Sequence, residues 1–413
     1  MADKTRSAKR RVYGKRVFAV GEEITNDTRI SGLNNNDLII GTAGRGKTGG
    51  YVIPNIQCID GSLVVSDTKR QLYKRFGKEL ESKGYAVYTL DLVEPENSCS
   101  FNPLSYIRRR KDGRIREQDI ITLSRVICPF LDMREPIWDM CAQNYMEFLI
   151  GFCLETEPES DQNMITVAEL HRRYNQINGD IPFIEWVTEH PDSFASKKYK
   201  ELKANQNAEK MWASVMGFVN IDLEPFSFKE SEMLFKENSF DIAELGRNKT
   251  VLFINTSDTD RAFDNIANIF YTQAMQVLCT EADSKPDGRL EVPVRLILDD
   301  FAAGSRIPDF DKLISVIRSR DISVSIILQS LSQLDTLYDH SMSVTVVDNC
   351  DNILYLGGRD METARFVANA AGRTPESVFS MPIDKAYLIR GGEKARLVQK
   401  IVPYSTVDDY EPT

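Results

Sequence analysis

The sequence predicts an α/β protein whose mostly parallel sheet is interrupted by an inserted all-α domain, and three observations predict it. Short β-type runs alternate with helical stretches over residues 38–104. Long helical segments without a convincing strand then fill residues 105–240, after which strand-type runs resume. The alternation indicates βαβ units and a parallel sheet. Because the sheet pattern stops and is later completed, one α/β domain with an insertion is favoured over two domains in series.

The first part of the α/β domain is predicted to contain strands in DLIIGT, SLVVSD and AVYTLDL. Between the last two lies KRQLYKRFGKELESKG, in which Leu72, Phe76 and Leu80 recur at helical spacing. The insertion is predicted to be helical in DIITLSRVICPFLDM, WDMCAQNYMEFLIGFCLE and KMWASVMGFVNIDLE. Strands are then expected in TVLFINTS (250–257), VRLILDDF (294–301), ISVSIILQS (322–330), NILYLGG (352–358) and AYLIR (386–390), and a helix over 267–282. The expected division is a basic N-terminal segment (1–36), an α/β domain (37–104 and 241–413) and an all-α insertion (105–240).

The composition excludes several classes of protein. With 413 residues, 42% apolar and 27% charged, the chain is neither disordered nor collagenous nor a small disulfide-stapled fold. No run approaches the ~18 consecutive apolar residues that a membrane span needs, and the N-terminus has no apolar signal core. The seven cysteines are scattered without a C-x-x-C pair, and there are three histidines. We therefore expect reduced, cytosolic cysteines rather than a disulfide framework or a zinc site.

Two basic clusters stand out against the formal net charge of −10. Residues 1–16 hold seven lysines and arginines against the single acid Asp3, and the second cluster is IRRRKDGRIR (107–116). The acidic total argues against a nucleic-acid footprint over the whole surface, but not against a local one. Each cluster is either a solvated tail or loop, or a contact for phosphate backbones or anionic lipid heads.

The strongest motif is a complete G-x-x-x-x-G-K-[ST] match directly after the strand DLII. It comprises Gly41, Thr42, Ala43, Gly44, Arg45, Gly46, Lys47 and Thr48. In such a loop the glycines let backbone N–H groups converge on a phosphate, aided by the positive end of the following helix. Lys47 is expected to reach the β- and γ-phosphates of ATP, and the Thr48 hydroxyl to bind Mg²⁺. The alternative, a glycine-rich turn, does not account for the strand–loop–helix context.

The helix after this loop is predicted to be weak. Gly49 and Gly50 each lower its stability by about 1 kcal/mol relative to alanine. Pro54 should bend or end the helix about two turns in.

A second nucleotide-site signal is the pair Asp299 and Asp300 after the apolar strand VRLIL. Asp299 is placed to organise Mg²⁺, and Asp300 to polarise the attacking water. Glutamate is more usual at the second position; a carboxylate set back by about 1 Å can lower the rate by ~10²-fold. The alternative is that two acids simply cap a strand before a loop.

Gln329 and Arg318 are weaker candidates. Gln329 lies at the end of the apolar run ISVSIILQS, where a P-loop domain would place a γ-phosphate sensor. Taken alone this is a weak signal, because many strands end in glutamine. Arg318 and Arg320 end the preceding helical segment. They either interact favourably with the helix C-terminus or supply an arginine finger to a neighbouring subunit's nucleotide, and residue types alone leave both interpretations open.

These residues resemble the type IV coupling proteins, the TraG/TraD-like hexameric ATPases that deliver DNA to conjugation and type IV secretion channels. The resemblance covers most of the chain. It is carried by NNNDLIIGTAGRGKTGGYVIPNI, SLVVSDTKRQL, GYAVYTLDL followed by FNPL, REPIWDM, LDDFAAGSRIPDFDKLISVIRSRDISVSIILQSLSQL and VDNCDNILYLGG. The segment 298–334 is the most specific. The resemblance implies a RecA-like motor domain interrupted by an all-α domain that helps to recognise relaxosome and secreted substrates.

The resemblance also assigns roles. Lys47 and Thr48 match its Walker A pair, and Asp299 its Walker B acid. Gln329 matches the glutamine after the third motor strand, and Arg318 the proposed trans-acting arginine, which favours the arginine-finger interpretation.

Three departures from the family pattern matter. Asp300 stands where glutamate is usual, which predicts slow hydrolysis or altered geometry. Arg70 stands where glycine is common, which leaves the role of that loop open. The N-terminal membrane helices typical of the family are not found, which is compatible with a soluble variant, a chain trimmed of its anchor or a partner of a separate membrane subunit.

The leading hypothesis is a homo-hexameric, DNA-stimulated ATPase that pumps DNA to a type IV secretion channel. It would act at the cytoplasmic face of the bacterial inner membrane, with a relaxase or a secreted protein as a further partner. A nucleotide-gated adaptor with little hydrolysis is the alternative that Asp300 suggests. A chromosome-partitioning pump is a third hypothesis, which the large insertion after FNPL disfavours.

Overall fold

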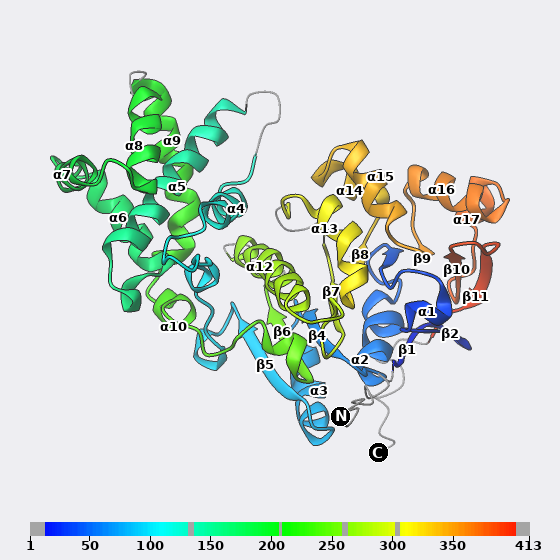
Figure 1. Ribbon diagram of the computed structural model, residues 1–413. Coiled ribbons are helices and arrows are strands. Elements are labelled where there is room, and N and C mark those ends of the chain that lie inside the picture. The colour runs from blue at the N-terminus through cyan, green and yellow to red at the C-terminus, as the bar shows by residue number, and fades with distance from the viewer. Residues whose placement is uncertain (1–12, 131–135, 206–208, 258–262, 302–305, 402–413) are drawn as a thin grey trace, which may run out of the picture.

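The computed structural model describes residues 13–130, 136–205, 209–257, 263–301 and 306–401. Figure 1 shows a sheet covered by helices on both faces and a separate group of helices beside one end of it. The sheet has nine strands in the order β11-β10-β9-β3-β8-β7-β4-β6-β5. Neighbouring strands from β9 to β5 are parallel, whereas β10 is antiparallel to β9 and β11. The predicted fold class, α/β with a mostly parallel sheet, is confirmed.

All eight strands expected from the sequence are present. They are β3 (Asp37–Gly41), β4 (Ser62–Ser66), β5 (Ala86–Asp91), β6 (Thr250–Asn255), β7 (Val294–Leu298), β8 (Ile322–Leu328), β9 (Asn352–Gly357) and β10 (Lys385–Arg390). Strands β3, β4, β6, β8 and β9 are buried at every residue. Helices on both faces of a parallel sheet bury its strands in this way, which is why the strands are largely apolar.

Helices α2 (Ile53–Gln57) and α3 (Gln71–Ser82) cover one face of the sheet. The predicted stripe of Leu72, Phe76 and Leu80 is confirmed, since all three side chains are buried against this face together with Ile39 of β3. Leu38 and Ile40 alternate with Ile39 and point into the core on the other face. The helices of that face and of the C-terminal region are α12 (Asp264–Asp283), α13 (Phe310–Val316), α14 (Leu331–Leu337), α15 (His340–Asp348), α16 (Met361–Ala371) and α17 (Pro375–Phe379).

Three short strands were not expected from the sequence. Strands β1 (Lys15–Ala19) and β2 (Glu22–Thr25) form a hairpin followed by α1 (Thr28–Ser31), and β11 (Arg396–Gln399) lies at the edge of the main sheet. The hairpin is fastened to β11, because the Val20 N–H donates to the Gln399 carbonyl at 3.0 Å. The Arg396 guanidinium also donates to both carboxylate oxygens of Glu22, at 2.8 and 2.9 Å. The N-terminal hairpin therefore meets the last described strand.

A group of helices lies between β5 and β6. These are α4 (Glu117–Ile127), α5 (Ile137–Thr156), α6 (Met164–Tyr174), α7 (Ile181–Glu189), α8 (Phe194–Asn205), α9 (Glu209–Leu223), α10 (Ser231–Phe235) and α11 (Glu244–Arg247). Helix α5 is central and packs against α4, α6, α8 and α9. Parallel neighbouring strands need a crossover connection, and between β5 and β6 these helices occupy it. The domain boundaries at 105 and 240 stay a prediction.

Among the described helices, none combines the length and apolar character that crossing a bilayer would need.

Candidate nucleotide-binding site

The glycine-rich loop follows the carboxyl end of β3, in the centre of the sheet. Gly44 and Gly46 have φ angles of 74° and 84°, a left-handed conformation that glycine adopts without penalty. The Thr42 N–H donates to the carbonyl of Gly357, at the end of the neighbouring strand β9, at 3.1 Å. Gly357 itself has a φ of 105°. The loop is therefore held by its own glycines and by the end of β9.

The helix after the loop begins with a π-helical turn, Thr48–Val52, and continues as α2. The Ile53 N–H donates to the Thr48 carbonyl, five residues earlier. This widened turn directly precedes Pro54, which lacks the N–H that a regular α-helix would use there. The helix ends at Gln57. The bend predicted from Pro54 thus takes the form of a π-turn and an early end.

The loop and the end of β7 bring together the groups that a magnesium nucleotide needs. The Lys47 ammonium donates to the Gly41 carbonyl across the loop at 2.8 Å. The Thr48 hydroxyl donates to a carboxylate oxygen of Asp299 at 3.2 Å. Burial raises the pKa of Asp299, and the neighbouring Asp300 raises it further, whereas Lys47 opposes both effects. Hydroxyl and carboxylate oxygens are suitable Mg²⁺ ligands, so these residues fit the ion.

Asp300 lies beside this pair but differs from it in exposure and in backbone. Its side chain is exposed, its φ is 52°, and its N–H donates to Asp299 at 3.0 Å. Aspartate tolerates the left-handed region several times better than most residues. The backbone thus gives a physical reason for aspartate at this position.

Gln329 lies at the same edge of the sheet. It follows β8, which is paired with β3 on one side and β7 on the other. Its backbone N–H donates to the side chain of Gln333 at 3.0 Å. Since the carboxyl ends of parallel strands share one edge, Gln329 lies between the nucleotide loop and Asp299.

Arg318 lies far from the nucleotide loop of its own chain. It lies in a 3₁₀ turn, Ile317–Arg320, before β8, and its exposed guanidinium donates to the Gly32 carbonyl at 3.3 Å. The strand between Arg318 and Gln329 is seven residues long, which at about 3.3 Å per residue separates them by roughly 20 Å. Arg320 is paired with Asp283 at 2.8 Å.

Two contacts to the loop were missed from the sequence. Gly357 is marked by the glycine pair that ends NILYLGG, so this signal was available. Lys400 follows β11, and its ammonium donates to the carbonyls of Leu356 at 2.6 Å and of Arg45 at 3.4 Å. No local sequence pattern predicts a contact between residues that are 355 positions apart.

Ion pairs explain why arginine can stand at position 70, where glycine is expected. Its φ is 54°, a left-handed position that favours glycine. The arginine is held there by ion pairs with Asp91, at 2.8 Å, and with Glu94. Arg70 thus acts as a bridge between the start of α3 and the end of β5.

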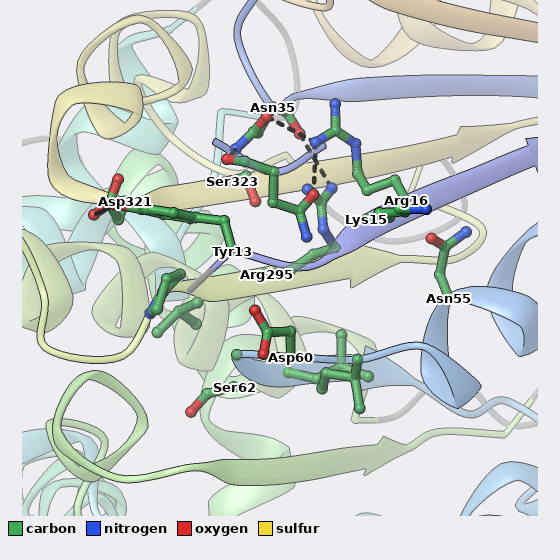
Figure 2. A pocket seen from close by; sticks show the side chains of 16 residues that line it. Tyr13, Lys15, Arg16, Asn35, Asn55, Asp60, Ser62, Arg295, Asp321 and Ser323 are labelled. Atoms are coloured by element: carbon green, nitrogen blue, oxygen red, sulfur yellow. Dashed lines mark hydrogen bonds between the residues drawn. The ribbon is translucent and has the colours of Figure 1, made fainter. Parts of the chain in front are cut away.

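The basic N-terminal cluster is in part structural. Arg16 is only 1% exposed and pairs with Asp37 at 2.9 Å, so it is not a solvent-facing phosphate contact. Figure 2 shows Arg16 and Arg295 meeting at Asn35, beside a cavity of about 50 Å³. This cavity lies where β4, β7 and β8 begin, at the edge opposite the nucleotide loop. Residues 1–12 lie outside the described residues.

The second basic cluster is partly neutralised within the chain. Arg108 pairs with Asp119 at 2.7 Å, and Arg114 pairs with Asp112 at 2.6 Å. The cluster therefore presents less positive charge than the sequence IRRRKDGRIR indicates.

The strand order and the loop define a RecA-like P-loop nucleoside triphosphatase fold. The family described as Type IV secretory system conjugative DNA transfer matches residues 1–401, and the chain belongs to this family of type IV coupling proteins.

Curated relatives agree with this assignment. The chain is 20% identical to a Protein VirD4 of Rhizobium rhizogenes over 367 residues, which covers 87% of this chain and 52% of that protein. A Protein VirD4 of Agrobacterium fabrum is 20% identical over 346 residues, 83% of this chain and 50% of the relative. The chain thus spans about half the length of the curated relatives it matches.

Solved structures show the same fold. The unbound monoclinic form of the bacterial conjugative coupling protein TrwBdeltaN70 matches with a TM-score of 0.70 at 16% identity, over 95% of this chain and 90% of the other. TrwB in complex with ADP and Mg²⁺ matches with a TM-score of 0.69 at 16% identity and the same coverage.

Proposed function

We propose that this chain binds ATP with Mg²⁺ and hydrolyses it to recruit DNA, or a nucleoprotein substrate, and pump it into a type IV secretion channel. The observation that carries the proposal is the contact between Thr48 and Asp299, with Lys47 and Gln329 at the same edge of the sheet. A bound Mg²⁺ would supply charge neutralisation at the β- and γ-phosphates. The structural match to TrwB, which was solved with ADP and Mg²⁺ and with an ATP analogue, supports this assignment.

In this proposal each residue of the site has one role. Lys47 reaches the terminal phosphates, Thr48 and Asp299 hold Mg²⁺, and Asp300 polarises the attacking water. Gln329 senses the γ-phosphate from its position between the loop and Asp299.

A hexameric ring accounts for Arg318. Since Arg318 is exposed and lies far from the nucleotide loop of its own chain, we assign it to a neighbouring subunit's nucleotide. The proposed ring acts at the cytoplasmic face of the inner membrane. Its other partners are a relaxase or secreted protein and the secretion channel or a separate membrane subunit.

The second candidate function is a nucleotide-gated adaptor that binds ATP, assembles and presents the helices between β5 and β6 to a relaxase or effector. Asp300 favours it, because this exposed carboxylate replaces the longer glutamate at the water-activating position.

The deciding experiment is ATP hydrolysis by the purified chain with and without single- and double-stranded DNA. Lys47→Ala is the test variant, and Lys312→Ala, at an exposed lysine paired with Asp309, is the control. We expect DNA-stimulated turnover that Lys47→Ala abolishes while the variant stays folded. Equal turnover in Lys47→Ala would overturn the assignment, and nucleotide binding without turnover would favour the adaptor.

A further inference from the structure

The C-terminal end of the described chain lies against the nucleotide loop. Lys400 leaves β11, and its backbone N–H donates to the Asp384 carbonyl at 2.9 Å, which fixes where its side chain starts. The half-buried ammonium then donates to the Leu356 carbonyl at 2.6 Å and to the Arg45 carbonyl at 3.4 Å. One side chain therefore connects the last strand, the end of β9 and the loop.

A second contact follows at the next residue. The Ile401 carbonyl lies 3.4 Å from the position that a Cβ on Gly50 would occupy. Gly50 is in the π-helical turn that begins at Thr48. The end of the chain thus approaches the loop at Arg45 and the first helical turn at Gly50.

The hydrogen bond from Lys400 to the Arg45 carbonyl orients the peptide group that joins Arg45 to Gly46. In a trans peptide the carbonyl of one residue and the N–H of the next point in opposite directions. Holding the Arg45 carbonyl towards Lys400 therefore fixes the direction of the Gly46 N–H, which points away from Lys400. Converging N–H groups are what a loop of this kind offers to a phosphate, so the orientation of this peptide affects nucleotide binding.

The charge at this position is consistent with such a role. Burial lowers the pKa of Lys400 to about 8, and the Arg45 guanidinium lowers it too, whereas Asp384 raises it. The ammonium is therefore charged at neutral pH, and a hydrogen bond from a charged donor is about twice as strong as a neutral one.

We propose that Lys400 is a positioning residue for nucleotide binding, which holds the Arg45 peptide and joins the C-terminal strand to the P-loop. This inference rests on the proposed function only in that the loop takes a nucleotide. A matched control lies in the same hairpin: Lys385 donates to the side chain of Gln399 at 2.7 Å. It stabilises the β10–β11 pair without a described contact to the loop.

The test compares Lys400→Met, Lys400→Arg and Lys385→Met with the unmodified chain. Affinity for fluorescent ATP with Mg²⁺ and kcat are measured, together with hydrogen exchange of the amides of residues 42–47 without nucleotide. We expect Lys400→Met to weaken ATP binding about tenfold, the effect of losing one charge-assisted hydrogen bond. Its loop amides should also exchange faster. Lys400→Arg should retain binding to within about threefold because it keeps charge and donors, and Lys385→Met should bind normally.

Two outcomes would overturn the inference. Unchanged affinity and unchanged loop exchange in Lys400→Met would show that the contact is incidental. Equal losses in Lys400→Met and Lys385→Met would show that only hairpin stability matters. If the unmodified chain binds no nucleotide, the proposed function fails, while loop exchange still decides the role of Lys400. If Lys400→Met does not fold, Lys400→Gln takes its place in the same measurements.

Discussion

The hydroxyl of Thr48 lies 3.2 Å from the carboxylate of Asp299, although the two residues are 251 positions apart. Strand order explains the contact, because only β8 separates β3 from β7 in the sheet. All three strands are parallel, so the segments that follow them lie at one edge. The pairing of strands therefore assembles the proposed Mg²⁺ site from two distant parts of the sequence.

Asp300→Glu tests whether hydrolysis is weakened in this chain. We expect kcat to rise by about tenfold or more, because a carboxylate misplaced by ~1 Å can lower the rate by up to 10². The φ of 52° is less favourable for glutamate, so a loss of up to about 1 kcal/mol in unfolding free energy should accompany the gain. Asp309→Glu is the control, since Asp309 is also left-handed, with a φ of 53°, but lies outside the site. An unchanged kcat would remove Asp300 from the water-activating role.

Arg318→Ala should separate binding from turnover. Arg318 is exposed, so we expect unfolding free energy to change by less than about 0.5 kcal/mol. ATP affinity should be unchanged, while kcat should fall by about 10³-fold if this residue is an arginine finger in trans. Arg320→Ala is the control, because Arg320 faces Asp283 of its own chain. Full activity of Arg318→Ala under conditions where the ring forms would rule out the role.

Arg70→Gly relieves backbone strain but also removes an ion pair, so its effect on stability shows which contribution is larger. Glycine relieves a left-handed conformation that disfavours arginine by about 1–2 kcal/mol. The substitution also leaves Asp91, which is 2% exposed, without its ion-pair partner, which costs about 3–5 kcal/mol. We expect a net destabilisation of about 2 kcal/mol in urea unfolding. Adding Asp91→Asn should recover part of the loss, and a stabilised Arg70→Gly would contradict this argument.

Asp222 on α9 should make the stability of the inserted helices depend on pH. Its pKa is raised to about 6, mainly by burial and also by the nearby Asp139, while a hydrogen bond with Cys128 opposes the shift. The folded pKa exceeds the usual 3.8 of the unfolded chain, so the folded state binds the extra proton. The ionised group therefore lowers stability above pH 6, and this penalty disappears as the pH falls towards 4. Asp222→Asn should be more stable than the unmodified chain at pH 7.5, with the difference vanishing near pH 4 in thermal melts.

Sequence patterns predicted most of the sheet because its central strands are long apolar runs that are buried on both faces. Strands β2 and β11 were not predicted, since both are only four residues long and neither is a continuous apolar run. The nucleotide loop was readable as a local motif. The contact of Lys400 with Arg45 and the left-handed backbone of Asp300 depend on tertiary structure, so no local pattern contains them.

The placement of the helices between β5 and β6 has a consequence for how members of this family can diverge. β5 is the outermost strand on its side of the sheet, and four strands separate it from β3, which the nucleotide loop follows. A module attached at that border can be enlarged, trimmed or exchanged without disturbing the strands around β3. In the proposed function, recognition of the transported substrate and hydrolysis of ATP would then lie in parts of the chain that can change independently.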